Sequence, residues 1–326
     1  MQSKKCIAIT KTVDDHKWKS TSFDEGREMY MRIDIKDLQK NFGETKALKG
    51  ISFSVNQGEA FGLLGRNGAG KTTAIRIILG IIDKDGGSIT VDGKDIRSQK
   101  LKFGYLPEER GLYLKYSVSD QLIYLARING MDKNTAKKNL LNLLEEFQIP
   151  SYYNKKVESL SKGNKQKIQL IASILHNPDI VVLDEPFSGL DPVNIELFKS
   201  VIKRLLKEGK TVLFSSHRMG DVEEFCKRIA LLKSGEIILS GDLEDIKEKY
   251  QQNQIEIDTS GDLSKYIESN DLEIVEKQER KHIIRYRSNE QVNKFFKEIV
   301  ACGIEIFKFE YRKPTLNEIF IKELGD

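Results

Sequence analysis

The sequence predicts an α/β fold, in which a mainly parallel sheet carries helices on both faces and a smaller α+β domain follows. Three observations lead to this prediction. Short apolar segments alternate with segments of helical spacing between Arg32 and Ser215, as in βαβ units. The run Ile180–Leu183 is continuously apolar, which is typical of a strand buried on both faces. After about Glu244 the character of the chain changes to short strand-like segments with helices near the end.

Alternating and continuous apolar runs locate the strands of the larger domain. These are Arg32–Leu38, Ile51–Val55, Ala60–Leu64, Ser88–Val91, Phe103–Leu106, Ile180–Leu183 and Thr211–Ser215. Apolar residues at helical spacing locate its helices, which are Thr73–Leu79, Val118–Arg127, Lys133–Phe147, Lys165–Leu175 and Glu196–Lys207. Because most strands are separated by helices, the order of these segments favours parallel strand pairing.

The two ends of the chain differ from this central part. Residues 1–30 are polar, charged and without periodicity, so we expect a loosely ordered extension before a main domain over residues 31–244. Residues 245–326 are expected to fold as a separate α+β unit. Its strands are Ile255–Ile257, Leu272–Glu276, His282–Tyr286 and Ile304–Tyr311, and its helices are Gln291–Val300 and Pro314–Leu324. Thr315 and Glu318 have the spacing of a capping box at the start of the last helix.

Composition excludes several classes of protein. The net charge of +4 over 326 residues is too small to indicate a nucleic-acid binder. Cys6, Cys226 and Cys302 lie far apart, so neither a disulfide framework nor a zinc site is expected, and we interpret the last two as packing residues. No apolar run approaches the roughly 20 residues of a membrane span. The apolar patch near the N-terminus is also shorter than the apolar region of a signal peptide.

One loop carries a phosphate-binding motif. The residues Gly65-Arg66-Asn67-Gly68-Ala69-Gly70-Lys71-Thr72 match G-x-x-x-x-G-K-[ST] between an expected strand and an expected helix. Glycines let backbone N–H groups curl around phosphate oxygens, and the positive end of the following helix adds attraction. Lys71 places a charge near the β- and γ-phosphates, and the Thr72 hydroxyl is suited to Mg²⁺. We also count Thr73 among the nucleotide-binding residues. The alternative explanation of the whole motif is a chance glycine turn before a helix.

A pair of carboxylates follows the buried strand Ile180–Leu183. In α/β folds ligands bind at the carboxyl ends of the strands, where Asp184 and Glu185 are expected to project. Asp184 is suited to hold Mg²⁺, and Glu185 to activate the water that attacks the γ-phosphate. Taken alone, the pair is equally well explained as solvated acids at a strand end. Beside a phosphate-binding loop, the catalytic interpretation is favoured.

Further segments resemble one family. Leu160-Ser161-Lys162-Gly163-Asn164 resembles the L-S-G-G-Q signature of ABC ATPases. Ser188-Gly189-Leu190-Asp191 is similar to their D-loop, His217 to their switch histidine, and Phe42 to the aromatic residue that stacks on adenine. The resemblance covers roughly residues 31–240. It implies a RecA-like parallel core, an antiparallel β subdomain and a helical subdomain over about residues 108–165.

Two departures from the general motifs narrow the resemblance. Lys162 and Asn164 replace the usual Gly and Gln of the signature, and Glu108 stands where glutamine is usual. With Arg110-Gly111-Leu112-Tyr113, these positions resemble the ATPase subunits of bacterial sodium-efflux-type exporters, which tend to carry an appended C-terminal domain. Glu108 is then expected near the Mg²⁺ ion. Each of these residues also has a non-functional explanation. Phe42 could be a packing residue, His217 could be structural, and Lys162 and Glu108 could be solvated surface residues.

The resemblance implies an ATPase that works with partners. Ser161, Lys162 and Gly163 would close on the γ-phosphate of ATP bound by a second subunit in a head-to-tail dimer, either with a second copy or with a second ATPase. A separately encoded permease would hold the protein at the cytoplasmic face of the membrane, with export as the preferred direction. ABC proteins of translation or DNA repair and generic P-loop kinases or regulators are the competing classes. The single P-loop and the lack of sustained heptads argue against the first two.

Overall fold

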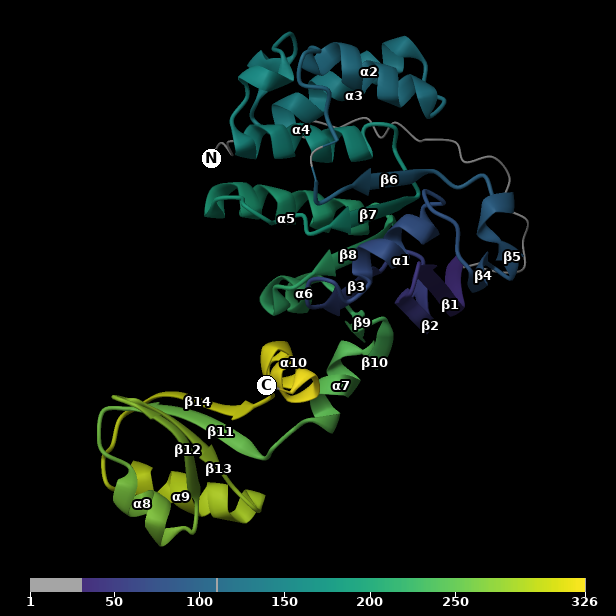
Figure 1. Cartoon of the computed structure of the whole chain (residues 1–326). Coiled ribbons are helices and arrows are strands. Elements are labelled where there is room, and N and C mark those ends of the chain that lie inside the picture. Colours follow the sequence, from purple (N-terminus) through teal and green to yellow (C-terminus); the bar gives the residue numbers. More distant parts are fainter. Residues whose placement is uncertain (1–30, 110, 326) are drawn as a thin grey trace, which may run out of the picture. The chain divides into compact units, whose positions relative to one another are not determined.

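The computed structural model describes residues 31–109 and 111–325 (Figure 1). The expected N-terminal extension, Cys6 and Arg110 lie outside these residues. Within the described residues, the chain from Met31 onward forms one compact unit. None of the described helices combines the length and apolar character that a membrane span requires.

A six-stranded sheet in the order β10-β9-β3-β8-β7-β6 forms the centre of the larger domain. Its members are β3 (Ala60–Gly65), β6 (Phe103–Leu106), β7 (Ile180–Asp184), β8 (Thr211–Ser216), β9 (Arg228–Lys233) and β10 (Glu236–Asp242). All neighbouring strands pair parallel except β9 and β10, which form an antiparallel hairpin. The predicted parallel sheet is confirmed, whereas the sequence analysis missed β9 and β10.

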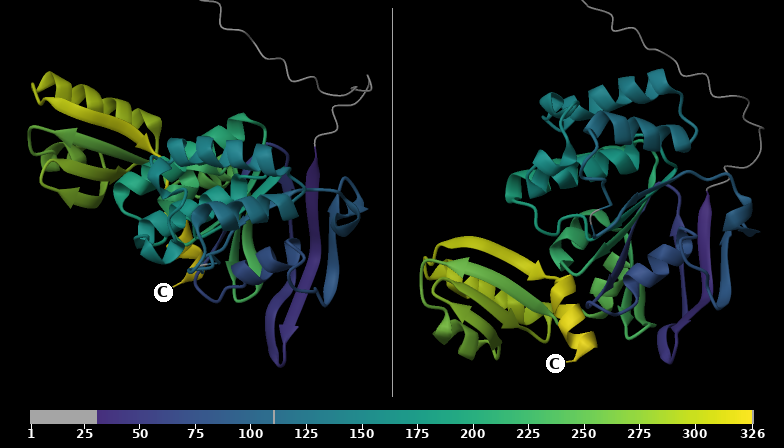
Figure 2. Two further views of the ribbon diagram at one scale, coloured as in Figure 1. Left: turned by 90° about the horizontal axis from the view of Figure 1, so that it is seen from above. Right: turned by 45° about the horizontal axis from the view of Figure 1, so that its top comes forward.

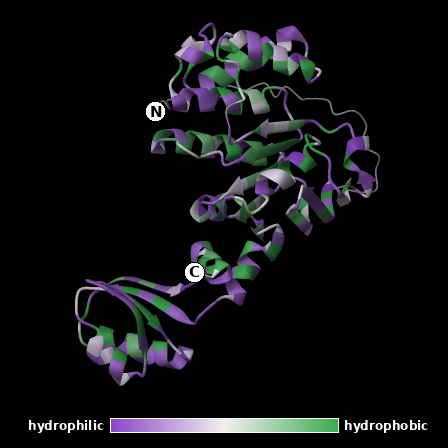
Figure 3. Cartoon of the chain, in the orientation of Figure 1, coloured by the Kyte–Doolittle hydropathy of each residue, from purple (hydrophilic) through white to green (hydrophobic). Residues whose placement is uncertain are grey.

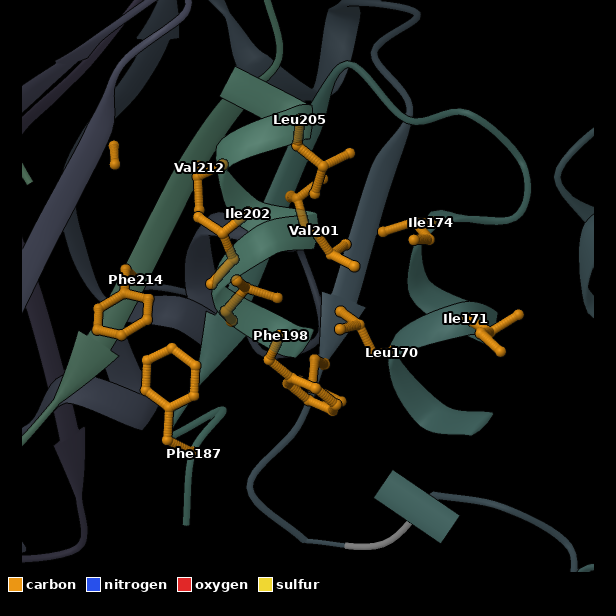
Figure 4. Close-up of a cluster of buried hydrophobic side chains, with 14 of the residues drawn as sticks. Leu170, Ile171, Ile174, Phe187, Phe198, Val201, Ile202, Leu205, Val212 and Phe214 are labelled. Atoms are coloured by element: carbon orange, nitrogen blue, oxygen red, sulfur yellow. The ribbon is translucent and has the colours of Figure 1, made fainter. Parts of the chain in front are cut away.

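The apolar run of β7 has a direct structural explanation. Val181 and Leu183 belong to the hydrophobic cluster on one face of the sheet, and Ile180 and Val182 to the cluster on the other face. On the first face lies α5 (Pro192–Lys207), whose side chains meet those of β8 in Figure 4. The helix α4 (Lys162–Ile174) belongs to the same cluster and lies farther from β8 in this view. The strand therefore has no polar face, as predicted. Figure 3 shows the contrast, with hydrophobic strands beside helices of alternating hydropathy.

An antiparallel sheet and a helical region complete the larger domain. The sheet has the order β2-β1-β4-β5 and shares the second hydrophobic cluster with α1 (Lys71–Ile78). Its strands are β1 (Arg32–Phe42), β2 (Thr45–Asn56), β4 (Gly86–Val91) and β5 (Lys94–Asp95). The helical region contains α2 (Val118–Ile128), α3 (Lys133–Glu146) and α4, which share the first cluster. Short 3-10 helices occur at Ile96–Ser98, Pro150–Tyr152 and Val157–Ser159.

The start of α4 corrects the sequence analysis. The helix was expected from Lys165, but it begins at Lys162, so most of the signature-like segment lies in its first turn. The reason is local: the Ser161 side chain accepts a hydrogen bond from the Asn164 backbone N–H and caps the helix there. Ser161 and Gly163 therefore lie at a helix N-terminus, as expected.

The C-terminal part contains a second antiparallel sheet, in the order β12-β13-β11-β14. Its elements are β11 (Gln254–Thr259), α8 (Ser264–Ser269), β12 (Glu273–Gln278), β13 (Lys281–Arg285), α9 (Asn289–Ala301) and β14 (Ile306–Arg312). The helices α8 and α9 cover one face of this sheet and close a small hydrophobic core of its own (Figure 2). Cys302 follows α9 and is exposed, so its interpretation as a packing residue is wrong; Cys226 is buried.

Two helices link this part to the larger domain. The capping box of Thr315 and Glu318 is present at the start of α10 (Leu316–Leu324). Leu316 and Ile319 of α10 belong to the first hydrophobic cluster, not to the core of the C-terminal sheet. The helix α7 (Leu243–Lys249) packs into the same cluster and contains the expected boundary between residues 244 and 245. The helix α6 (Met219–Phe225) is the neighbour of α10: its Glu223 Oε1 accepts the Leu316 N–H at 2.5 Å.

Candidate nucleotide-binding site

The phosphate-binding loop lies between β3 and α1, where its glycines have no substitute. Gly65 has φ +151°, and a Cβ there would lie 2.5 Å from the Leu232 carbonyl oxygen. Gly70 has φ +109°, and a Cβ there would lie 2.8 Å from the Ala47 carbonyl oxygen. Both positions therefore require glycine for backbone conformation and for close approach of other strands. The Gly235 N–H donates to the Ala69 carbonyl at 3.0 Å and fixes the loop from the β9–β10 turn.

A cavity of about 550 Å³ opens beside this loop. Nine residues predicted from the sequence line it: Arg66, Asn67, Gly68, Gly70, Lys71, Thr72, Thr73, Glu108 and Glu185. Six others were missed: Thr45, Lys46, Ala47, Lys49, Ser234 and Gly235. These come from β2 and from the β9–β10 turn, which carry no motif, so only the packing of the sheets brings them to the loop.

Lys71 connects the loop to the Glu185 carboxylate. Its side chain is buried, and its Nζ donates to the Gly65 carbonyl at 2.7 Å. The same Nζ lies 3.6 Å from Glu185 Oε1, which makes a buried ion pair at the edge of the cavity. The charge of Lys71 is therefore held where phosphate oxygens would enter the loop.

Glu185 is held from two sides. It follows β7 with φ +50°, a conformation that non-glycine residues rarely adopt and that often marks functional positions. Its backbone N–H lies 3.2 Å from both the carbonyl and the hydroxyl oxygen of Ser215 on β8. Its Oε2 lies 2.8 Å from Nδ1 of His217, which follows β8. The structure thus brings Glu185, His217 and Lys71 together, as predicted.

Asp184 has one oxygen free for a further ligand. Its Oδ1 accepts a hydrogen bond from the Ser215 hydroxyl, whereas its buried Oδ2 has no hydrogen-bond partner among the described residues. Buried polar atoms are normally paired, so the orphaned oxygen fits a further polar partner, and Asp184 could hold a divalent metal ion through a water molecule. The described residues contain no cluster of three His, Cys, Asp or Glu side chains that could hold a metal by themselves.

Two neighbouring groups respond to the electrostatics of the site. Burial raises the pKa of Tyr105 on β6, and the negative charge of Asp184 adds to this effect. Burial also raises the pKa of Asp221 on α6, against the opposing effect of Arg218, whose Nε lies 3.2 Å from its carboxylate. In both cases burial is the largest cause, because it disfavours the charged form of an acidic group.

Phe42 and the signature residues do not line this cavity. Phe42 is 52% exposed, with Lys40 Nζ 5.5 Å from its ring centroid. Ser161, Lys162 and Gly163 belong to α4 and its cap. A Cβ on Gly189, which has φ +70°, would lie 2.5 Å from Lys162 Nζ, so the Lys162 side chain lies against the D-loop-like segment. Lys162 and Glu108 line a second cavity of about 320 Å³, so Glu108 borders both.

The parallel sheet, the P-loop and the carboxylate pair together define a P-loop nucleotide-binding ATPase. Comparisons with known proteins go further. The family model "ABC transporter" matches residues 48–188, and the model "ATP-binding protein DrrA1-3-like, C-terminal domain" matches residues 241–324. The uncharacterized ABC transporter ATP-binding protein YhaQ of Bacillus subtilis (strain 168) is 44% identical over 295 residues, which cover 90% of this chain and 98% of YhaQ. The chain belongs to the family of ABC transporter ATP-binding proteins.

Two further similarities concern function and assembly. The linearmycin resistance ATP-binding protein LnrL of the same organism is 30% identical over 305 residues, which cover 90% of this chain and 98% of LnrL. The dimeric structure of MJ0796, a bacterial ABC transporter cassette, has a TM-score of 0.60 at 25% identity and covers 65% of this chain and 98% of its own. The resemblance to exporter ATPases with an appended C-terminal domain is confirmed. The protein is an ATP-hydrolysing subunit of an ABC transporter.

Proposed function

We propose that the chain hydrolyses Mg²⁺-bound ATP with Glu185 as the general base, and that it energises export through a separately encoded permease. The observation that carries this proposal is that Glu185, which lines the P-loop cavity together with Lys71, contacts both Lys71 and His217. Glu185 Oε1 is buried and lacks a hydrogen-bond partner among the described residues. It is therefore available to accept a proton from water, which contributes about 10²–10⁴-fold to such reactions.

Each side chain has a separate task in this proposal. Lys71 and the backbone N–H groups of residues 66–72 bind the phosphates. His217 donates to Glu185 Oε2 and orients the carboxylate, so that Oε1 faces the attacking water. A positioned base of this kind acts only if its geometry is fixed before the reaction, and the backbone contacts to Ser215 support that.

The residues around Asp184 are suited to a divalent ion. We assign Thr72 and Asp184 to hold Mg²⁺; Thr72 and Glu108 both line the cavity. The ion would neutralise charge on the transferred phosphoryl group. Glu108 brings a negative charge where a glutamine would bring a neutral oxygen, so the metal dependence is expected to respond to this position.

The signature-like segment supports a head-to-tail dimer. Ser161 and the N–H of Gly163 lie at the N-terminus of α4, a position that attracts anions, yet they do not line the cavity of their own chain. In the proposed dimer they contact the γ-phosphate in the second subunit, and Lys162 adds a positive charge. Either a second copy or a second ATPase can supply this contact.

An exposed apolar surface is our candidate for permease binding. Tyr116 and Tyr124 are 60% and 62% exposed, and Tyr113, Leu114 and Ile128 are exposed beside them in sequence. These residues lie on α2 and in the segment that joins it to Glu108. Apolar patches of this kind mark interaction sites. Binding there would place the chain at the cytoplasmic face of the membrane and connect the permease to the loop that borders the nucleotide. The name of LnrL, which refers to resistance, supports export.

The proposal is tested with the purified chain and the polytopic membrane protein encoded next to it. We expect Mg²⁺-dependent phosphate release from ATP by the chain alone, and stimulation by the permease in proteoliposomes. The double variant Tyr116→Ala and Tyr124→Ala should keep the basal rate and lose the stimulation. Ile81→Ala, which removes another exposed apolar side chain, is the matched control. Full stimulation of the tyrosine variant would exclude this surface, and absence of ATP hydrolysis would refute the proposed activity.

A further inference from the structure

The strand β14 forms an open edge of the C-terminal sheet. It pairs with β11 on one side, and among the described residues no strand pairs with its other side. An open edge presents unpaired backbone N–H and C=O groups and is a template for another strand. The opposite edge, β12, is interrupted by a register shift between Ile274 and Glu276. In β14 the corresponding shift lies near Ile306, so the part from Lys308 to Arg312 is regular.

Apolar side chains line the open edge. Phe307 and Tyr311 of β14 are 52% and 45% exposed, and Phe296 and Val300 of the adjoining helix α9 are exposed as well. Phe309 connects them, because its ring centroid lies 5.2 Å from that of Phe296 and 5.7 Å from that of Tyr311. A row of exposed aromatic rings along an unpaired strand indicates an interaction surface.

The charges of β14 indicate which partner fits. Lys308 and Glu310 lie on the same face of the strand, opposite Asp258 and Glu256 of β11. If β14 pairs antiparallel with a second β14 about a two-fold axis at Phe309, Lys308 of each strand faces Glu310 of the other. Phe307 then faces Tyr311 of the other strand. Opposite charges and aromatic pairs directly across a ladder are stabilising.

The charges also determine the register. An axis moved by one residue to Lys308 would place the two Lys308 side chains opposite each other. An axis at Glu310 would do the same for the two Glu310 side chains. Like charges directly opposite are unfavourable, so of these three axes only the one at Phe309 places each charge opposite its complement. A two-fold axis requires a surface that is complementary to itself, and β14 has this property.

We propose that β14 pairs antiparallel with β14 of a second copy of this chain, centred on Phe309, so that two C-terminal sheets join into one. This contact is separate from the ATP-dependent contact of the proposed function, because it uses neither nucleotide nor the signature-like segment. The regular seam is short, so the association alone is expected to be weak and concentration-dependent. Joined to an ATP-dependent contact, it would raise the effective concentration of one ATPase domain near the other.

Sedimentation velocity of the full chain without nucleotide tests the proposal over a range of protein concentrations. We expect reversible dimers of the wild type. Lys308→Glu and Glu310→Lys should each weaken dimerisation about tenfold or more, because two cross-strand charge pairs become repulsive. The double variant should dimerise again. An equimolar mixture of the two single variants should form heterodimers, since two acidic side chains of the first variant then face two basic side chains of the second.

The mixture separates pairing from loss of folding, since misfolded single variants would not rescue each other. Within the chain, Lys308 Nζ lies 2.7 Å from Glu256 Oε1 and 2.8 Å from Glu310 Oε2. Glu256→Gln is the control for loss of the first ion pair, and the double variant and the mixture are the controls for loss of the second. Glu256→Gln removes the first ion pair without changing the edge and should leave dimerisation intact. A wild type that stays monomeric at all concentrations, or charge reversals without effect, would overturn the proposal. Failure of ATP-dependent dimerisation alone would count against the proposed function and leave this inference standing.

Discussion

Replacement of Glu185 by Gln removes the proposed base with little change in shape. The amide oxygen of Gln is able to accept the hydrogen bond that His217 Nδ1 gives to Oε2 at 2.8 Å. The backbone of residue 185 keeps its contacts to Ser215. What is lost is proton acceptance, so we expect kcat to fall about 10²–10⁴-fold. At 1.36 kcal/mol per decade, this is about 2.7–5.4 kcal/mol of activation free energy.

Binding of ATP should survive the same change. Lys71 Nζ lies 3.6 Å from Glu185 Oε1, and the variant frees this ammonium from a competing carboxylate. Affinity for a fluorescent ATP analogue is therefore expected to stay the same or rise. Single-turnover hydrolysis measures the chemical step separately from product release. Glu208→Gln makes the same chemical change on an exposed residue at the end of α5 and is the control. A Glu185→Gln variant with the wild-type rate would refute the assignment of the base.

Three further predictions concern assembly, metal dependence and the C-terminal part. The Glu185→Gln variant should dimerise when ATP is added, as measured by light scattering. The Lys308→Glu change is included to remove β14 pairing, and absence of an ATP effect even with permease added would contradict the proposed head-to-tail dimer. Glu108→Gln should change the Mg²⁺ dependence or the permease stimulation more than nucleotide affinity, and identical metal titrations and stimulation would leave Glu108 a surface acid. Leu316→Ala should lower the free energy of unfolding by about 2–5 kcal/mol in a denaturant titration, because Leu316 is buried in the first hydrophobic cluster. Truncation after Gly241 should keep nucleotide affinity, since every residue that lines the main cavity precedes it; a folded truncated protein that binds no ATP would show that the tail completes the site.

Local motifs explain why much of the site could be predicted. The P-loop residues are contiguous. Their conformation needs positive φ angles that glycine adopts readily, so the glycines in the motif already indicate it. The carboxylate pair ends a strand whose apolar run marks it as buried on both faces. Both signals lie within a few residues of the atoms they predict. The same holds for the capping box at Thr315, where one turn of chain contains both partners.

Other features had no local signal. Lys46, Lys49 and Gly235 were missed because β2 and the β9–β10 turn reach the cavity only through the order of strands in two sheets. The start of α4 was placed too late because Ser161 caps it, and the capping interaction outweighed the weak helix-forming tendency of Gly163. The sequence analysis interprets Cys302 as a packing residue, in line with the frequent burial of cysteines, but Cys302 follows α9 and is exposed.

The sequence by itself determined the class of fold, the phosphate-binding loop and the residue types that could perform hydrolysis. Only the tertiary structure decided which of them meet. Three contacts join segments separated by 30 or more residues. They are the contact of Glu185 with His217, the hydrogen bond from Ser215 to Asp184, and the packing of α10 into the larger domain. Such contacts depend on which strands are neighbours and which helix faces remain to be covered. These are properties of the whole packed chain, and no local pattern of residues encodes them.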